Sequence, residues 1–533
     1  MCSRFNRQLI YSVMFGLAGL AGLLGCAQQN YKKDADERAY RIIDEKWDPN
    51  FGSKANYKIS DTEPLPDDLQ IDKEVTSFGV LTLPQAVALA TAHNRDYQSQ
   101  REALYIRALD LRLTRHEFET QFFGGGSAGY NADRDDEVVD VGARLGFNRL
   151  LAGGTRISVE LASAWAEVLT GNLRSGLASI LSVTIAQPLL RGSDRRVVLE
   201  TLTQAERDTL YQVRAFNRFR QTFVVSVISE YYRVLQHLDA VENARRNYSA
   251  LAWLDERVKD LADAGRVPLI ELDRVRQEKL QAANRYSQAE KDYKQALDEF
   301  KIMLSLPATA HIELDEIEFE ALKQAGMNEP EFAEEKIIEG ALVQRLDVAN
   351  SADAVIDAQR KVYVAADGLR PEANIIGSAN AISSRRADRR NLDWLREEYG
   401  LGLELDLALD RVPEQNVYRK ALITLNQRQR EYDLAADRVT LEVRRAHRDL
   451  AEAVERYDVL AEALELAQKR FDNAFLLLQY GKASSRRVLT AQNDLFDAQN
   501  DAAQALVDYN IATLNFYRDT GALQVLPDGM WKL

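Results

Sequence analysis

The chain has 533 residues, among them 68 lysines and arginines, 82 aspartates and glutamates and two cysteines. Its formal charge of −14 argues against nucleic acid as a partner, because phosphate binding needs a basic surface. The sequence holds no Gly-rich phosphate loop, no Gly-x-Ser-x-Gly elbow and no distinct carboxylate pair, and its five histidines stand at no metal-ligand spacing: His93, His116, His237, His311 and His447. These absences argue against an enzyme and predict no cofactor or metal.

The first thirty residues indicate export. Two arginines precede an apolar run at residues 10–24, the order and length of a secretory signal. The run ends in Leu23-Leu24-Gly25-Cys26, which resembles the bacterial lipobox, where the cysteine is acylated and begins the mature chain. An ordinary signal with an incidental cysteine is one alternative, and a short anchor helix is another. We predict a lipoprotein signal at 1–25, lipid on Cys26, and tethering to a membrane on its periplasmic side.

Signal removal would take Cys2, Arg4 and Arg7 with it. The basic count then falls from 68 to 66 against 82 acidic residues, a formal charge of −16. Cys26 would be acylated, so neither a disulfide nor a thiol catalyst would remain.

Residues 26–78 form a polar lead in which Pro49, Pro64 and Pro66 oppose helix formation. We expect this segment to be extended and to lie along something larger. The chain has only 11 prolines and no Gly/Ser-rich or Pro-rich linker in its middle, which favours one elongated body.

Long helices are expected on both sides of the strand regions. Helical pattern begins at Leu83-Pro84 and continues to about residue 118. Residues 194–261 contain neither proline nor glycine, and an unbroken helix there would approach about 100 Å. Residues 414–479 offer a second helix of this kind. Such lengths are typical of coiled coils and bundles, with small residues where helices meet.

Four segments alternate between apolar and polar residues with a period of two: 139–147, 157–161, 181–185 and 401–409. One apolar face and one charged face suit a barrel with lipid outside and water inside. A sandwich packed on its own core would give the same alternation. The position of these strands between very long helices favours the barrel, which so few strands could close only if subunits share it.

Two phrases occur twice. Ala264–Ile270 recurs in the second half of the chain as Tyr480–Arg486, each between helical patterns, and Ala90–Asp96 recurs as Ala341–Asp347. We therefore expect an internal two-fold repeat of helix, strands and helix. The predicted segments are a first repeat at 79–305 with strands at about 119–190, a connector at 306–332, a second repeat at 333–521 with strands at about 371–411, and a tail at 522–533.

Several of these phrases carry a family resemblance. Val183-Thr-Ile-Ala-Gln-Pro-Leu-Leu-Arg-Gly192 looks like the first strand-to-helix return of TolC-like outer-membrane efflux proteins. The phrase at 405–411, followed by Val417-Tyr418-Arg419, is similar to the second return, and 481–514 is similar to the family's periplasmic tip and return helix. The resemblance covers about residues 80–521.

The resemblance implies a mainly α fold with a transmembrane β-barrel portion, built as a homotrimer in which each subunit gives four strands to a twelve-stranded barrel. It implies a passive exit duct of a tripartite efflux or type I secretion system, located in the outer membrane and extending into the periplasm. An inner-membrane pump would supply energy, and a periplasmic adaptor would meet the helix-turn-helix tips. The docking residues would be Gly265, Arg266, Val267 and Pro268 with Gly481, Lys482, Ala483 and Ser484. Glycines between helices are also ordinary C-caps.

The sequence departs from the family in two places. Where the family often has two aspartates that narrow the tunnel, this chain has Arg487 and Thr490, and an arginine ring would favour anions. We hypothesise that Arg487 closes the resting aperture with Asp273 or Glu271 as ion-pair partner; a solvated Arg487 is the alternative. Residues 119–187 hold three or four strand runs with a turn at Gly153-Gly154, where the family usually has two strands. An enlarged external hairpin is one account.

Two other classes of protein compete with the duct. A lipid-anchored coiled coil of the envelope would have no pore and would leave the leucines at 401–409 unexplained. A periplasmic enzyme on a helical scaffold would need a cluster of reactive groups that the sequence does not offer.

Overall fold

The structure is a computed structural model that describes residues 28–51, 54, 57–59, 80–132, 137–168, 174–324, 333–386, 394–407, 409–480, 482–526 and 531–532. The expected signal, Cys26 and Gly481 lie outside these residues. The chain divides into two compact units, and each is described by itself. Unit 1 takes in Met1–Trp47, Ala103–Val213 and Ile356–Gln427, and unit 2 takes in Asp48–Glu102, Arg214–Val355 and Arg428–Leu533.

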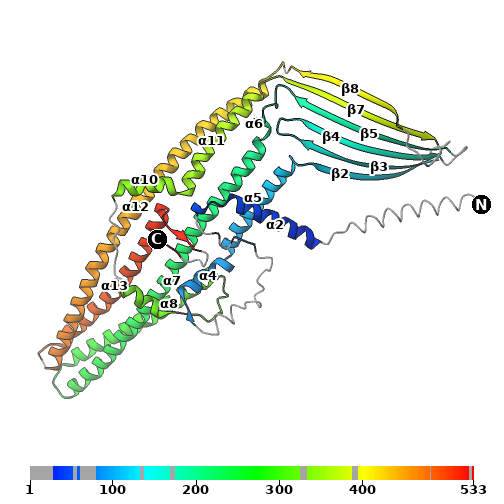
Figure 1. The fold of residues 1–533 in the computed structure, drawn as a ribbon. Coiled ribbons are helices and arrows are strands. Elements are labelled where there is room, and N and C mark those ends of the chain that lie inside the picture. The colour runs from blue at the N-terminus through cyan, green and yellow to red at the C-terminus, as the bar shows by residue number, and fades with distance from the viewer. Residues whose placement is uncertain are drawn as a thin grey trace, which may run out of the picture. The chain divides into compact units, whose positions relative to one another are not determined.

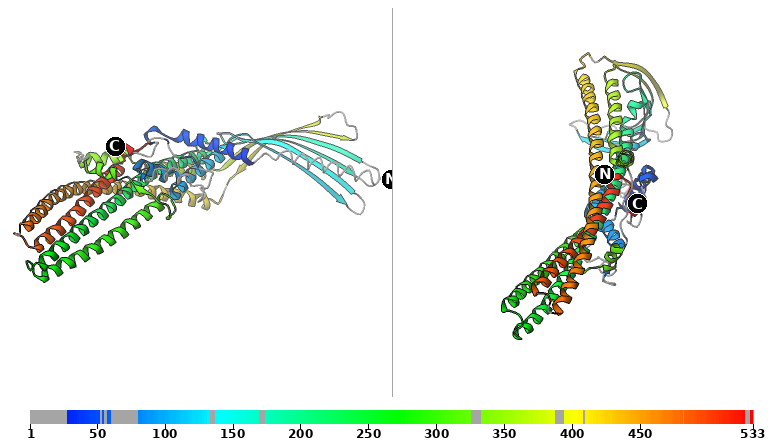
Figure 2. Two further views of the ribbon diagram at one scale, coloured as in Figure 1. Left: turned by 90° about the horizontal axis from the view of Figure 1, so that it is seen from below. Right: turned by 90° about the vertical axis from the view of Figure 1, so that its left-hand side faces the viewer.

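Unit 1 contains one antiparallel sheet of six strands in the order β2-β3-β4-β5-β7-β8 (Figure 1). Its strands are β2 (Gln121–Ala132), β3 (Glu137–Leu150), β4 (Arg156–Val168), β5 (Arg174–Pro188), β7 (Glu372–Arg386) and β8 (Trp394–Asp406). Figure 2 shows them as one curved layer. The alternating runs expected at 139–147, 157–161 and 181–185 lie in β3, β4 and β5, and β8 contains the expected run as far as Asp406, while Leu407 and Leu409 follow it.

The expectation of four strands per chain is wrong, because the first strand group contains four strands and the second contains two. An enlarged external hairpin does not describe the additional pair either. β3 and β4 pair in register with each other and with both neighbours over 12 to 13 residue pairs, so they are full members of the sheet. Period-two alternation marks β3, β4 and β5 but not the glycine-rich β2, so the sequence revealed strand runs without fixing their number.

A tight turn at Leu151–Thr155 joins β3 to β4, as expected at Gly153-Gly154. The backbone N–H of Leu151 donates to the carbonyl of Thr155 at 2.9 Å. Gly154 has φ +81°, and a Cβ added there would lie 2.5 Å from the carbonyl oxygen of Gly192. Glycine is therefore required by both backbone conformation and space.

The polar lead is not extended throughout, because α2 (Gln28–Lys46) is a helix of 19 residues. Its buried side chains, Ala39, Ile42 and Ile43, recur at helical spacing and are followed by buried Trp47. Asp34 on its polar side accepts from Arg38 at 3.0 Å and from Arg112 of α5 (Arg95–His116) at 2.9 Å. The sequence pattern did not reveal this helix, because many charged residues surround the four apolar ones.

In unit 1 a buried carboxylate joins the first turns of α7 (Glu200–Asp263) to the second half of α11 (Leu346–Asp367). Asp357 pairs with the Arg207 guanidinium at 2.5 Å and accepts hydrogen bonds from Tyr211 Oη at 2.6 Å and Arg360 Nη1 at 2.7 Å. Several partners around one buried charge offset its desolvation, so the contact fixes how these helices pack.

The expected long helices are present. The segment at 194–261 forms α6 (Arg195–Val198) and most of the 64-residue α7. The segment at 414–479 lies in the 68-residue α12 (Val412–Gln479). The return helices are α8 (Leu269–Met303) and α13 (Ser485–Thr520). None of the helices in the described ranges has a stretch apolar and long enough to span a bilayer.

In unit 2 the described helices meet around several apolar clusters. The largest joins α4 (Leu83–His93) to α7, α8 and α13. Another, here called the tip cluster, contains Leu251, Leu254, Val258, Leu272, Val275, Ala282, Ala474, Val488, Leu489 and Ala491 from α7, α8, α12 and α13. The remaining elements are η1 (Pro49–Phe51), β1 (Val80–Leu81), β6 (Glu313–Leu314), α9 (Glu316–Gln324), α10 (Glu334–Gln344), β9 (Gln524–Val525) and β10 (Trp531–Lys532).

The helix expected from Leu83 to about residue 118 is broken at Asn94, between α4 and α5. The Asn94 side chain accepts from the backbone N–H of Tyr97 at 3.0 Å and donates to the Met303 carbonyl at 2.8 Å. Arg345, in the matching phrase, occupies the break between α10 and α11. The backbone N–H of Asn94 donates to the carbonyl of Ala90 at 2.9 Å. The backbone N–H of Arg345 donates to the carbonyl of Ala341 at the same distance.

Arg345 is buried and bonds Asp347 at 2.6 Å and Glu442 of α12 at 2.5 Å. Burial alone would raise the pKa of Asp347, but the hydrogen bond from Arg345 and the positive charges of Arg345 and Arg218 together outweigh burial and lower that pKa. The matching phrases thus place a polar clamp at each helix break.

We predict that Gly154→Ala destabilises the sheet of unit 1. An alanine would have to adopt a left-handed backbone conformation and approach the Gly192 carbonyl, which together cost about 1–3 kcal/mol. The midpoint of thermal loss of the β circular-dichroism signal measures this. Gly153→Ala is the matched control, since a Cβ added at Gly153 would meet nothing within 4 Å. Equal midpoints for the two variants would contradict the prediction.

Candidate functional site

One face of the sheet is mainly apolar and exposed, and its charged side chains Glu137, Arg149 and Glu397 lie near the strand ends. Residues opposite each other in the ladder share a face, and this face carries Phe122, Tyr130, Val139, Val141, Leu145, Phe147, Val159, Leu161, Trp165, Leu181, Val183, Ile185, Ile375, Tyr399, Leu401 and Leu403. Leu401 is 84% exposed and Phe122 is 80% exposed. In the described part of the chain, no second sheet is paired or packed as in a sandwich on this face, since the other sheets have two strands each. An apolar surface of this extent requires an apolar environment.

The opposite face is mainly polar or small. It carries the charged side chains Asp140, Arg144, Arg156, Glu160, Glu372, Glu398, Glu404 and Asp406, among glycines, serines and alanines. A Cβ added at Gly125 would lie 3.2 Å from Arg144 Nε, and one at Gly129 would lie 2.5 Å from Asp140 Oδ1. Charged side chains therefore lie across the bare backbone of β2. This face suits contact with water.

The sheet has two open edges. Among the described strands, β2 pairs only with β3, and β8 pairs only with β7. Because all five pairings are antiparallel and the strands number six, β2 and β8 run in opposite directions. The free edge of β8 can therefore form antiparallel hydrogen bonds with the free edge of β2 in another copy.

The phrase at 187–192 anchors the end of β5 that leads into the helices. Gln187 Nε2 donates to the carbonyl of Gly153 at 3.3 Å, and the Gln187 side chain also contacts the Thr155 hydroxyl. Gly192, at φ +73°, donates its backbone N–H to the buried carboxylate of Asp367 at 2.8 Å. The motif holds the β3–β4 turn on one side and the end of α11 on the other.

Asp194 caps α6 and accepts from the Arg196 backbone N–H at 2.8 Å. Hydrogen bonds from the Arg196 guanidinium and then the Tyr363 hydroxyl hold the pKa of Asp194 well below its usual range. The cap therefore stays ionised at any physiological pH, in agreement with its place at a helix N-terminus.

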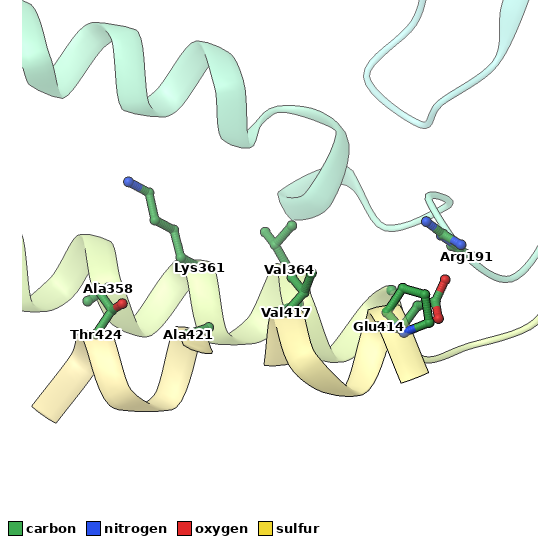
Figure 3. Close-up of a pocket in the computed structure, with 11 residues that line it drawn as sticks. Arg191, Ala358, Lys361, Val364, Glu414, Val417, Ala421 and Thr424 are labelled. Atoms are coloured by element: carbon green, nitrogen blue, oxygen red, sulfur yellow. The ribbon is translucent and has the colours of Figure 1, made fainter. Parts of the chain in front are cut away.

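A groove of about 470 Å³ lies between α11 and α12 in unit 1. Ala358, Lys361, Val364, Val417 and Ala421 line it, and Arg191 lies beside Glu414 at one end (Figure 3). The groove is open and mainly apolar, which suits helix packing better than a catalytic centre.

The two expected tips have the same backbone hydrogen bonds at equivalent positions. Arg266 N–H donates to the Leu261 carbonyl at 2.8 Å, and Lys482 N–H donates to the Leu477 carbonyl at 2.8 Å. Gly265 has φ +71° and open space around it, the geometry of a helix C-cap. Pro268 and Ser484 precede α8 and α13, Val267 packs on the tip cluster, and Ala483 is half-buried.

The aperture candidates do not all meet. Arg487 and Thr490 are exposed and line a groove of about 560 Å³ between α12 and α13, together with Arg470 and Arg486. Asp273 is exposed as well. Within the described residues of one chain, Arg487 forms no ion pair with Asp273 or Glu271, so such a pair would have to form between copies.

Glu271 has a different partner, which sequence reasoning missed. Ser485 Oγ donates to Glu271 Oε2 at 2.5 Å, and Arg274 pairs with Glu271 Oε1 at 2.9 Å. The bond joins the first residues of α13 to those of α8, so it links the two tips of one chain. The aligned phrases show only that Ser485 and Leu269 are equivalent first residues of the return helices, and they do not predict the bond.

No protein-family model matches the chain, and no curated protein matches it. Solved structures do resemble it. The Campylobacter jejuni CmeC outer membrane channel has 13% identity and a TM-score of 0.59 over 89% of this chain and 91% of that one. CusC has 15% identity and a TM-score of 0.59 over 82% and 92%, and the outer-membrane channel OprN has 14% and 0.58 over 88% and 95%. The chain therefore has the fold of these outer-membrane channels, as the TolC-like resemblance predicts.

We predict that Ser485→Ala loosens the tips. Loss of a hydrogen bond to a carboxylate costs about 1.5–3 kcal/mol, so amides that exchange by local opening should exchange at least about tenfold faster. Hydrogen exchange at the Arg266 and Lys482 amides measures this. Thr490→Ala is the control, because Thr490 is exposed and its hydroxyl bonds only the Arg486 carbonyl of its own helix. Unchanged exchange in Ser485→Ala would refute the link.

Proposed function

We propose that the chain is the exit duct of an export system in the outer membrane, a passive channel formed by three copies. The observation that carries the proposal is the sheet of unit 1, which has an exposed apolar face, a polar opposite face and two open edges of opposite direction. Strands of 12 to 15 residues exceed the 9–11 residues or so that a tilted strand needs to cross the hydrocarbon.

Closure of the sheet between copies follows from the cost of an open edge in lipid. Each unpaired backbone N–H or carbonyl in hydrocarbon costs several kcal/mol, so only a closed barrel is stable there. Joining β8 of one copy to β2 of the next removes every edge. The apolar side chains then face lipid, and the charged and small side chains line a water-filled lumen.

Solutes would pass through this lumen and never enter the hydrocarbon. The described residues hold no group of three metal-ligating side chains, and the sequence contains no nucleotide-binding motif. We therefore assign energy supply to an inner-membrane pump and contact with it to a periplasmic adaptor.

The adaptor would dock on the tips. Leu269 and Ile270, beside the first turn, are each 69% exposed, and Tyr480 beside the second is 71% exposed. Exposed apolar side chains at a helical turn, next to exposed Arg266 and Lys482, suit a protein partner better than solvent. Acylation of Cys26 would add a lipid anchor to the outer membrane.

Planar-bilayer recording of the purified protein, with its mass measured by light scattering, tests the duct. We expect discrete conductance steps from a trimer. A monomer or dimer without conductance would instead support a lipid-anchored coiled coil of the envelope, a protein that has no need of an exposed apolar sheet.

We predict that Arg487→Ala changes the asymmetry of the current. Three arginines near one axis repel cations, and their field acts within about 10 Å in 0.1 M salt, so the permeability ratio should shift toward cations by roughly twofold or more. Reversal potentials in a salt gradient measure this. Arg486→Ala removes the same charge about 100° around the helix and serves as control. If both variants behave like the unaltered protein, Arg487 is a solvated surface residue.

A further inference from the structure

We infer that the barrel has eighteen strands, not twelve, and that it forms an exit wide enough for solutes about 20 Å across. The inference rests on the proposed trimeric duct and concerns its width. Its basis is the single six-stranded sheet in each chain, which three copies would join edge to edge.

The additional pair, β3 and β4, belongs to the wall and not to a plug inside it. β3 has 14 residues and β4 has 13, and the other four strands have 12 to 15. They lie between β2 and β5 in the sheet order and are hydrogen-bonded along both sides. A plug would leave β2 and β5 paired with each other, and they are not.

Both faces of the pair match the rest of the wall. Val141, Leu145 and Phe147 of β3 continue the apolar face, as do Val159, Leu161 and Trp165 of β4. Asp140, Arg144, Arg156 and Glu160 lie on the polar face. A pair with one lipid-compatible face and one water-compatible face can occupy only the boundary between the two media.

The turn of the pair is held at the helix end of the sheet. Gln187 Nε2 contacts the Gly153 carbonyl, and a side chain at Gly154 would meet Pro188 and Gly192. These contacts fix β3 and β4 to the same return that carries β5 into the helices. Hydrogen bonds along both edges and contacts at the turn therefore hold β3 and β4 in the sheet.

Width follows from strand number. With strands about 4.8 Å apart and tilted by about 40°, eighteen strands give a backbone diameter of about 36 Å, and twelve give about 24 Å. Side chains that project about 5 Å inward leave lumens of about 26 Å and 14 Å, respectively. Aqueous channels are the rule for barrels of sixteen to eighteen strands.

Polymer exclusion tests the width. Poly(ethylene glycol) fractions of graded size are added to one side of a bilayer and then to the other, and the size at which the single-channel current ceases to fall gives the exclusion limit. The deciding fraction has a diameter of about 20 Å, which lies between the lumens expected for eighteen and for twelve strands. We expect this deciding fraction to enter the unaltered barrel. Its exclusion from both sides, in a conducting trimer, overturns the inference and leaves the duct intact.

Deletion of residues 137–168 removes β3 and β4 and supplies the narrow reference. We expect a conducting trimer that excludes the deciding fraction. The matched control, Asp140→Asn with Arg144→Gln, Arg156→Gln and Glu160→Gln, removes the charges of the pair and keeps its strands, so its limit should equal that of the unaltered protein. Equal limits for the deletion and the unaltered protein overturn the inference.

The exclusion limit of the unaltered protein decides the question even if the deletion variant does not fold. An unaltered protein with no conductance overturns the duct, and the eighteen-stranded exit with it, which distinguishes that failure from a narrow pore.

Discussion

The antiparallel ladder of six strands is the constraint on which unit 1 depends. Its backbone hydrogen bonds place every second side chain on the same face, so one face collects Leu145, Leu161 and Leu401 while the other collects Arg144 and Glu160. The same ladder satisfies the backbone of the four inner strands and leaves β2 and β8 with free edges. A surface of this kind needs an apolar environment on one face and a partner strand at each edge. The membrane insertion and self-association that we propose would therefore both follow from one hydrogen-bonding pattern.

The strand-to-helix connections join that sheet to the helices. Glycines at 154 and 192 let the chain turn back closely, and polar side chains fill the positions around them, with Gln187 on the β3–β4 turn and Asp367 on the Gly192 amide. In unit 2 the helix breaks are clamped in two different ways, by the Asn94 amide and by the buried Arg345 guanidinium. The same backbone hydrogen bond forms at both breaks, although the side chains around them differ.

The tips show the same combination of a shared backbone and different side chains. Both turns close with the same backbone hydrogen bond, yet the chain places Glu271 at the start of one return helix and Arg487 at the equivalent position of the other. Glu271 is bound within the chain by Ser485, whereas the Arg487 side chain is exposed. This asymmetry is the property on which the aperture hypothesis depends.

The sequence by itself determined the period-two strands, the long helices without proline or glycine, the Gly153-Gly154 turn and the outer-membrane channel fold, because these depend on local pattern and on short phrases in a fixed order. It did not determine the strand number, since period-two alternation marks β3, β4 and β5 but not the glycine-rich β2, and pairing partners are set by nonlocal hydrogen bonds. It missed α2, whose apolar side chains Ala39, Ile42 and Ile43 are buried by tertiary packing, and the break at Asn94, which a contact with the Met303 carbonyl stabilises. The Ser485–Glu271 bond was likewise decided by tertiary structure, because 214 residues separate its partners and only the packing of α8 against α13 brings them together.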